Sequence, residues 1–497
     1  MSQHRVAIVW LRRALRLADN PALAHALEAA DAVVVAAPAR ESRGGAASRA
    51  WRARSLAALD ASLRDLGTRL VVVADDSAAT LAALVAGCGA ALVCFDRAYE
   101  PGTAAADALT WIVLRDGSIE ALVFDRTLPN ELAGPLASGG GPFKVFTPYY
   151  NACLRLGAPD APLPAPQRIP APDVTPPGEP LPEGTQHPIG GWWTPGEAGA
   201  LAAARHFAAG ALADYPVDRD RPDLIGTSRL SPHLAFGEIS PRQVVALLAD
   251  AADAAGAGDS AAEPATDPAA GAAAGAADSD DGTRPDAASA FIRQLYWREF
   301  AYHTLHHFPE TPERPLRTAF ERMGWAEDPA GFAAWCEGRT GYPIVDAGMR
   351  ELAATGWMHN RVRMIVASFL TKDLLLPWQD GARHFREHLA DADLANNTFG
   401  WQWVAGSGAD AAPYFRVFNP VLQGQKFDPR GAYVRAWVPE LAGLPDAWIH
   451  RPWEASAGVL AQAGVTLGET YPAPIVDHPW ARQRALAAYG AIRGGRG

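Results

Sequence analysis

The sequence has few cysteines and no long apolar run. Its four cysteines, Cys88, Cys94, Cys153 and Cys336, lie far apart in no metal-ligand spacing, so we expect buried thiols and neither a disulfide framework nor a metal site. No run of 18 apolar residues occurs, and the N-terminus MSQHRVAIVW leads into a strand-like segment rather than a signal peptide. These absences predict a cytoplasmic protein with no membrane partner.

The chain also lacks a GxGxxG motif after its first apolar run, so a dinucleotide site of that kind is not indicated there. The first 125 residues instead alternate apolar runs with helical patterns, and the runs are at 6–11, 32–38, 69–75, 91–96 and 120–125. This alternation predicts a doubly wound α/β domain at residues 1–130, with a parallel sheet covered on both faces.

Two composition changes divide the rest of the chain. Residues 131–196 have the pattern of a long, proline-dense connector, and residues 197–490 that of an all-α domain. Within this domain, residues 251–289 are nearly all Ala, Gly, Asp, Ser and Pro, which predicts a disordered surface insertion. Residues 250–286 carry a net charge of −8, so only −3 of the total of −11 remains for the other residues. That balance permits a basic groove for nucleic acid.

Two predicted helices place an amide beside a large soft side chain. Gln294 and Trp297 are three residues apart in FIRQLYWREF, and Asn360 and Met364 are four apart in GWMHNRVRM, so each pair shares a helix face. An amide both donates and accepts, as the imide edge of a pyrimidine requires, while Trp and Met offer surfaces for stacking. Two ordinary amphipathic helices with satisfied polar residues fit the pattern equally well.

The stretch GTSRLSPHLAFGEISPR places Thr227, Ser228 and Ser231 around Arg229 at the start of a helix. Free N–H groups at such a start favour an anion such as a pyrophosphate. A plain cap, with Ser231 before Pro232, is the equal alternative.

Two acids and two amides occur together in DADLANN, residues 391–397, just before GWQW. Buried acids need cationic partners, and Arg361 and Arg363 are the candidates. In a helix, Trp401 and Trp403 point about 200° apart. The two indoles should therefore serve different purposes.

These stretches stand in the order seen in the photolyase and cryptochrome family. GTSRLSP, WREF, TGYPIVDAGMR, GWMHNRVRM, KDLL, GWQW, PYFRVFNP and KFDP resemble its motifs, as do WLRRALRLADNPAL and GGPFKVFTPYY nearer the N-terminus. The resemblance covers nearly the whole chain except residues 251–289. Within the family the chain looks most like a class I cyclobutane pyrimidine dimer DNA photolyase, a deoxyribodipyrimidine photo-lyase.

The resemblance implies an N-terminal antenna-type domain and a helical domain that holds FAD in a U-shape. Reduced, light-excited FAD would pass an electron to a dimer flipped out of UV-damaged DNA, and the protein would act as a monomer. Asn397 would face flavin N5, and Arg363 would pair with Asp391. The positions that match flavin contacts are Tyr215, Thr227, Ser228, Arg229, Leu230, Ser231, Arg363, Asp391, Asp393 and Asn397.

The resemblance also assigns residues to DNA and to electron transfer. Trp297 and Trp403 would stack on the extruded dimer. Trp401, Trp378 and Trp325 would form a chain that carries electrons from the surface to the flavin. The positions that match lesion or DNA contacts are Gln294, Trp297, Arg298, Asn360, Arg361, Met364, Trp403 and Arg416.

The N-terminal domain departs from the family pattern. Ala14 stands in RALR where the family has RDLR, and the region after Tyr99-Glu100 differs from the antenna-folate pattern. A second chromophore of folate or deazaflavin type, and its identity, is therefore left open.

Gln294 stands where class I enzymes have a dimer-binding glutamate. Glutamine keeps one acceptor and two donors but cannot transfer a proton, and we expect Gln294→Glu to stay within a small factor of wild type. A cryptochrome-type blue-light photoreceptor is the alternative function. Asn397 argues against it, because plant-type receptors tend to have Asp and animal-type receptors Cys at this position.

Overall fold

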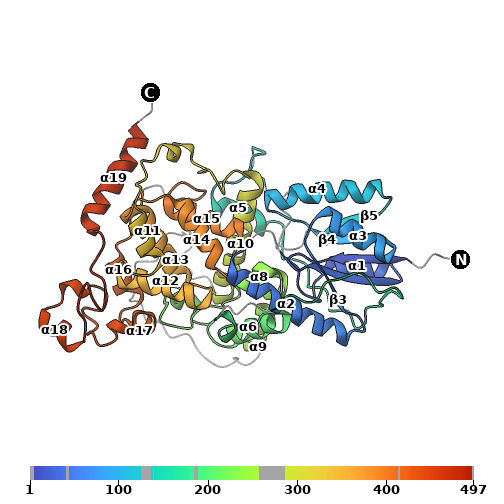
Figure 1. Ribbon diagram of the computed structural model, residues 1–497, viewed down its shortest axis with the longest axis horizontal. Coiled ribbons are helices and arrows are strands. Elements are labelled where there is room, and N and C mark those ends of the chain that lie inside the picture. The colour runs from blue at the N-terminus through green and yellow to red at the C-terminus, as the bar shows by residue number, and fades with distance from the viewer. Residues whose placement is uncertain are drawn as a thin grey trace.

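The chain folds into a sheet domain followed by a helical domain, with the N-terminus and the C-terminal helix at opposite ends of the molecule (Figure 1). The computed structural model describes residues 5–40, 44–124, 136–137, 139–183, 188–256, 286–411 and 415–494. Within these ranges, no helix has the length and apolar character needed to span a lipid bilayer.

The sheet domain has five parallel strands in the order β3-β2-β1-β4-β5. The strands are β1 (Val6–Trp10), β2 (Ala32–Pro38), β3 (Leu70–Val73), β4 (Ala90–Asp96) and β5 (Glu120–Phe124). Both faces of β1 and β2 are buried, which explains why these runs are continuously apolar rather than alternating.

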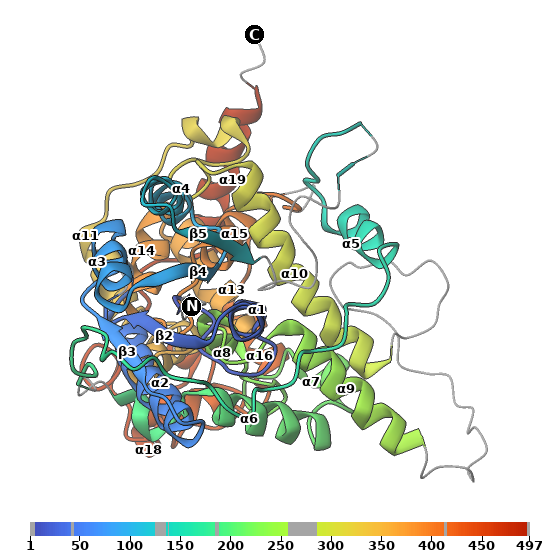
Figure 2. The same ribbon diagram turned by 90° about the vertical axis from the view of Figure 1, so that its right-hand side faces the viewer.

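Four helices cover the sheet (Figure 2). They are α1 (Pro21–Ala29), α2 (Ala46–Asp65), α3 (Ala78–Cys88) and α4 (Pro101–Asp116). Side chains of α1 and α2 pack with one face of the strands, and those of α3 and α4 pack with the other. The predicted doubly wound α/β domain is therefore confirmed, and the strand order reverses between β1 and β4, where such folds form a crevice.

The second part of the chain is helical, as predicted, around a core centred on α12 to α15. A short π-helix, Phe369–Asp373, interrupts the path from α13 to α14. The longer helices are α6 (Glu197–Ala209), α9 (Pro241–Gly256), α10 (Ala287–His307), α11 (Pro329–Cys336), α12 (Pro343–Thr355), α13 (Asn360–Ser368), α14 (Trp378–His388), α15 (Leu394–Ala405), α16 (Pro420–Phe427) and α19 (His478–Gly494). The short ones are α7 (Tyr215–Asp218), α8 (Ser231–Phe236), α17 (Ala432–Trp437) and α18 (Ala457–Gln462).

Two sequence expectations were wrong in part. The connector is not all loop, because it contains α5 (Phe146–Leu154), whose Phe146, Tyr149 and Cys153 are buried and cluster with Tyr296 and Phe300 of α10. The expected insertion is also too long: α9 continues to residue 256 and α10 begins at 287. The rest of the expected insertion, 257–285, lies outside the described residues.

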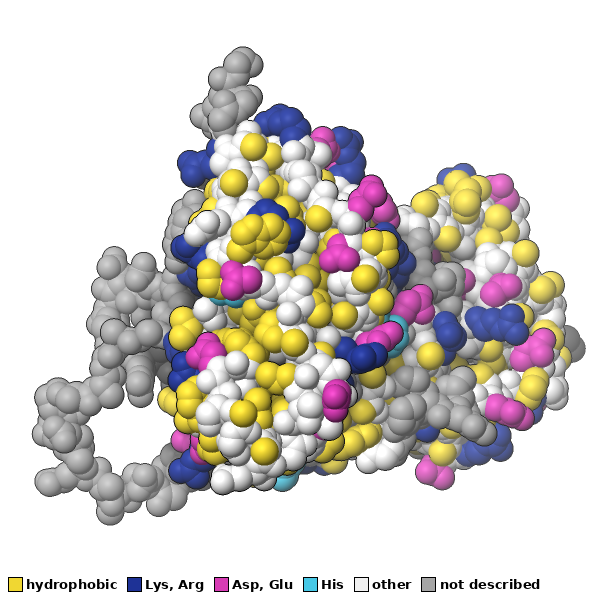
Figure 3. Space-filling model, turned by 60° about the vertical axis from the view of Figure 1, so that its left-hand side comes forward, with side chains coloured by type: hydrophobic (Ala, Val, Ile, Leu, Met, Phe, Trp, Pro, Cys, Tyr) yellow, Lys and Arg dark blue, Asp and Glu magenta, His cyan; other side chains and the backbone are white. Residues whose placement is uncertain are grey.

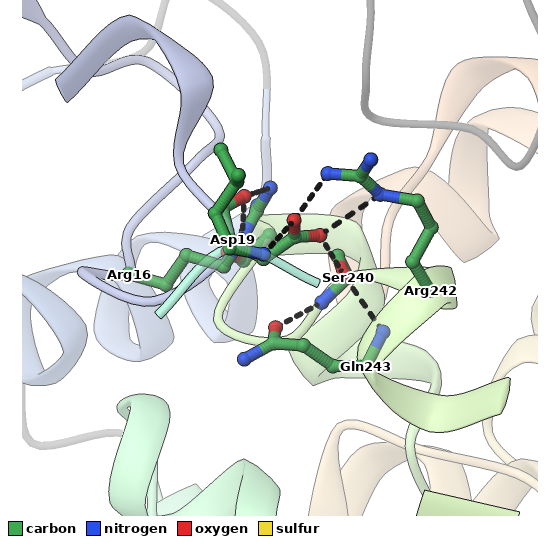
Figure 4. Close-up of polar contacts among 7 residues, drawn as sticks. Arg16, Asp19, Ser240, Arg242 and Gln243 are labelled. Carbon is green, nitrogen blue, oxygen red and sulfur yellow. Dashed lines mark hydrogen bonds and ion pairs between the residues drawn. The ribbon is translucent and has the colours of Figure 1, made fainter. Parts of the chain in front are cut away.

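A buried polar junction joins the two domains (Figure 4). Asp19, in the loop after β1, is fully buried and accepts hydrogen bonds from the Arg242 guanidinium and from Ser240 Oγ at 2.5 Å. Arg16 donates to the backbone oxygens of Asp19 at 2.7 Å and Gly237 at 3.0 Å. The start of α9 and the end of α8 are thereby fixed to the sheet domain.

We expect Asp19→Asn to destabilise the protein, because it leaves Arg242 buried without its counter-charge. Removing one partner of a buried ion pair costs about 3–5 kcal/mol, and the free energy of unfolding from urea denaturation measures the loss. The matched control is Asp65→Asn at an exposed position of α2, which should change stability by less than about 0.5 kcal/mol. Equal stability of the two variants would contradict the role given to the junction.

Candidate functional site

An ion pair between a half-buried arginine and a buried aspartate lies between α13 and the segment that leads into α15. Arg363 Nη2 donates to Asp391 Oδ2 at 2.8 Å, and Arg363 Nε donates to the backbone oxygen of Met358 at 2.8 Å. The pairing expected from the sequence is therefore present. Asp391 Oδ1 and His359 Nε2 are both buried and have no hydrogen-bond partner among the described residues. Unsatisfied buried polar atoms are costly, so each of these two atoms is a candidate to bind a polar group of a ligand.

Asp393 is a helix cap as well as a candidate ligand contact. Its Oδ1 accepts from the Asn396 backbone N–H at 2.8 Å and begins α15, and its Oδ2 accepts from the Tyr302 hydroxyl. Burial alone would raise the pKa of Asp393, but the charges of Arg298 and Arg13 and its hydrogen bonds hold it below the usual value. The carboxylate therefore stays ionised while buried.

Asn397 lies on α15, one turn after Asp393. Its Nδ2 donates to the backbone oxygen of Ala382 on α14 at 2.9 Å. That bond fixes the amide orientation and leaves the carbonyl oxygen available to a ligand.

The loop 227–231 is tied to the residues just before α13. Trp357 Nε1 donates to Ser231 Oγ at 3.1 Å, and the Arg229 guanidinium lies 5.1 Å from the centre of the Trp357 ring. The cap expected at Ser231 is wrong, because Leu230 occupies the cap position and makes no side-chain cap bond. Ser228 Oγ instead accepts from the Leu230 backbone N–H at 3.3 Å. Thr227, next to Ser228, is half-buried.

A second cluster lies on α10 and α13. Residues 219 and 220 bridge the two helices, because Arg219 Nη2 donates to Gln294 Oε1 at 3.1 Å and Arg361 Nη2 donates to Asp220 Oδ2 at 2.6 Å. Asn360 is exposed, and its Nδ2 lies 3.9 Å from Met364 Sδ. The predicted shared face of Asn360 and Met364 is therefore confirmed. We give the name amide–indole cluster to Gln294, Trp297, Asn360, Met364 and Trp403, because the resemblance places all five at the dimer.

Other residues expected at DNA have protein partners. Arg361, besides its pair with Asp220, stacks over Phe427 at 4.4 Å. Trp297 is stacked on Phe146 of α5, with ring centroids 3.7 Å apart, so one of its faces is already covered. Arg416 is half-buried. Basic and acidic side chains are interspersed on the face that carries α19 (Figure 3), so that face shows no patch of one charge.

The two indoles of GWQW differ in burial, as their spacing predicts. Trp401 is 3% exposed, whereas Trp403 is half-buried. Trp401 packs directly on α14: a Cβ at Gly381 would lie 2.1 Å from its ring, so only glycine leaves room there. Gly381 is one turn beyond Trp378, which is 2% exposed. Trp325 is partly exposed.

A pocket of about 740 Å³, partly open to solvent, lies where the strand order reverses between β1 and β4. Its lining includes Arg12, Arg13, Tyr99, Arg298 and Tyr302. Arg298, which the resemblance assigns to DNA, has its guanidinium over the Tyr302 ring and donates to the backbone oxygen of Leu234 at 3.2 Å. The face of α10 that carries Arg298 and Tyr302 is turned towards the sheet domain.

Several residues of these sites were missed from the sequence. Trp357 and His359 stand inside GWMHNRVRM and could have been assigned from that motif. Arg219 stands one helical turn after Tyr215, and its guanidinium lies 5.4 Å from the centre of that ring. Trp335 is fully buried with its ring 6.1 Å from Trp401, and no pattern in the sequence indicated that contact.

Two family models match the chain: DNA photolyase over residues 7–167, and the FAD binding domain of DNA photolyase over residues 291–491. A deoxyribodipyrimidine photo-lyase from Agrobacterium fabrum is 45% identical and covers 98% of each chain. Cryptochrome-1 from Arabidopsis thaliana is 38% identical, covering 96% of this chain and 69% of that protein. A crystal structure of a class III photolyase from Agrobacterium tumefaciens superposes with a TM-score of 0.89 at 43% identity, covering 99% of each chain. The chain therefore belongs to the photolyase and cryptochrome family and carries that family's FAD-binding domain.

Proposed function

We propose that this protein repairs cyclobutane pyrimidine dimers in DNA in a light-driven reaction. The observation that carries the proposal is that one helix, α13, bears residues of both candidate sites. Arg363 on this helix pairs with Asp391, while Asn360 and Met364, within one turn of it, belong to the amide–indole cluster. A flavin beside Asp391 and a dimer beside Asn360 would thus share one helix, which suits electron transfer over a short distance.

FAD in its reduced state would supply, on absorbing light, the electron that splits the cyclobutane ring. The chain's own residues bind and orient both partners. Asp391, Asn397 and the loop 227–231 would hold the flavin, with the free atoms of Asp391 and Asn397 directed to it. Trp403 and the uncovered face of Trp297 would stack on the extruded dimer, while the amides of Gln294 and Asn360 meet its imide edges.

The subclass is the finer question. Relatives named photolyase and relatives named cryptochrome both match over almost the whole of this chain. The sequence suggested class I, but Gln294 departs from that class, and the solved relative at 43% identity is a class III photolyase. The amide–indole cluster supports repair over a purely signalling role, because its amides could bond the imide edges of a dimer and its indoles could stack on it.

We also propose that the pocket at the sheet edge holds a second chromophore of folate or deazaflavin type. The pocket lies where the strand order reverses, which is the usual ligand position in open α/β sheets. The lining carries charges of both signs, with Asp76, Asp96 and Glu100 beside its arginines, so it suits a ligand that both donates and accepts hydrogen bonds. The rings of Tyr99 and Tyr302 offer apolar contact.

A light–dark comparison tests the proposed function. Purified protein loaded with FAD and chemically reduced is mixed with dimer-containing DNA, and the dimers remaining are counted after illumination or darkness. We expect dimers to disappear only in the light. A protein that binds FAD and responds to light but leaves the dimers intact is a photoreceptor, and one that takes up no FAD contradicts both functions.

Replacing Trp378 by Phe should stop light-driven reduction of oxidised flavin, because it interrupts the chain from Trp325 to Trp401. Repair by flavin that has been reduced chemically should remain close to wild type. The matched control is Trp480→Phe, at an indole that is 54% exposed on α19, which should change neither rate. Flavin absorbance under illumination and dimer counting measure the two activities, and loss of repair in the pre-reduced Trp378→Phe protein would show that Trp378 has another role.

A further inference from the structure

The amide of Gln294 is held at both ends. Its Oε1 accepts from Arg219 Nη2 at 3.1 Å, and its Nε2 donates to the backbone oxygen of Ala290 at 3.1 Å. These two bonds fix which end of the amide faces Arg219. One N–H of Nε2 and one lone pair of Oε1 remain free, so the side chain can still donate to a carbonyl oxygen and accept from an N–H of a ligand.

Arg219 is itself fixed in place. Its guanidinium lies 5.4 Å from the centre of the Tyr215 ring, and Tyr215 packs edge-on against Phe291 at 5.2 Å. Phe291 stands on α10 one turn before Gln294, so the platform under Arg219 is anchored to the helix that carries Gln294. The neighbouring carboxylate, Asp220, is engaged by Arg361. The Arg219 guanidinium is therefore held in place beside the carbonyl oxygen of the Gln294 amide.

We propose that Arg219 is a positioning residue that makes Gln294 act in place of a protonated carboxyl group at the dimer. This inference rests on the proposed repair function. Negative charge develops on the dimer when it receives the electron, and donors that are already oriented stabilise such charge without reorganisation. A hydrogen bond from Arg219 to Oε1 draws electron density from the amide, which strengthens the N–H that Gln294 offers to the dimer. No proton has to be transferred.

The Arg219–Gln294 pair changes the expected effect of Gln294→Glu. A carboxylate at position 294 would form an ion pair with Arg219, and an opposite charge that close favours the ionised form. The dimer would then face an anion just where its own negative charge develops. Gln294→Glu should therefore lose repair at neutral pH, in contrast to the near-neutral effect expected from the sequence, and should recover as acid protonates the carboxylate.

The test measures repair yield per absorbed photon with chemically reduced, FAD-loaded protein and saturating dimer-containing DNA. We expect Arg219→Gln to lower the yield by about threefold or more, as for loss of a hydrogen bond to a charged group, and Arg219→Lys to restore most of it. Gln294→Glu should be impaired at neutral pH and improve at lower pH. The double variant Arg219→Gln with Gln294→Glu should exceed Gln294→Glu alone, because the carboxyl is no longer held ionised.

The matched control for loss of positive charge is Arg482→Gln, at an exposed position of α19, which should keep the wild-type yield. FAD content confirms that each variant is folded. The inference is overturned if Arg219→Gln leaves the repair yield at saturating DNA unchanged. If the variant also binds damaged and undamaged DNA more weakly to an equal extent, and with a smaller salt dependence, Arg219 is a phosphate contact. Wild-type protein that leaves dimers intact in light overturns the proposed function and this inference together.

Discussion

A carboxylate that is removed from water needs a cation or several hydrogen-bond donors, and Asp391 has the Arg363 guanidinium as its cation. The pair fixes how α13 is rotated about its axis, and Asn360, the first residue of the helix and one turn before Arg363, is exposed. Because α15 begins three residues after Asp391, with Asp393 as its cap, the same pair also sets where Asn397, Trp401 and Trp403 point. Both clusters of the candidate site therefore depend on one ion pair.

The same kind of constraint holds the two domains together. Asp19 is paired with Arg242 across the boundary, and Glu238 accepts from the Trp51 indole N–H at 2.8 Å while it contacts His233 Nδ1 at 2.5 Å. Hydrogen bonds are directional, whereas apolar contacts permit sliding. The walls of the sheet-edge pocket, which come from both domains, are thus held at a defined separation.

Local patterns in the sequence predicted local structure well. The strands were found because they are short apolar runs, the first three of them followed by helical patterns, and the opposed indoles followed from the helical repeat alone. Contacts between distant residues were not accessible: Arg361 could not be matched to Asp220, 141 residues away, and nothing marked Arg298 as facing the sheet domain. The helix α5 was missed because prolines dominate its surroundings, while its own apolar residues acquire a partner only when α10 packs against them.

The stack of Trp297 on Phe146 limits what can meet that indole. Phe146 also lies parallel to Tyr150 with centroids 5.6 Å apart, and Arg293 lies over both rings. Tyr150 and Trp297 thus both lie parallel to Phe146, and Phe399 packs against Trp297 with centroids 5.9 Å apart. A flat ligand that reached Trp297 could lie only on the face of the indole that Phe146 does not cover. Rotation of Trp297 would break its stack on Phe146, so the indole is held in one orientation before any ligand arrives.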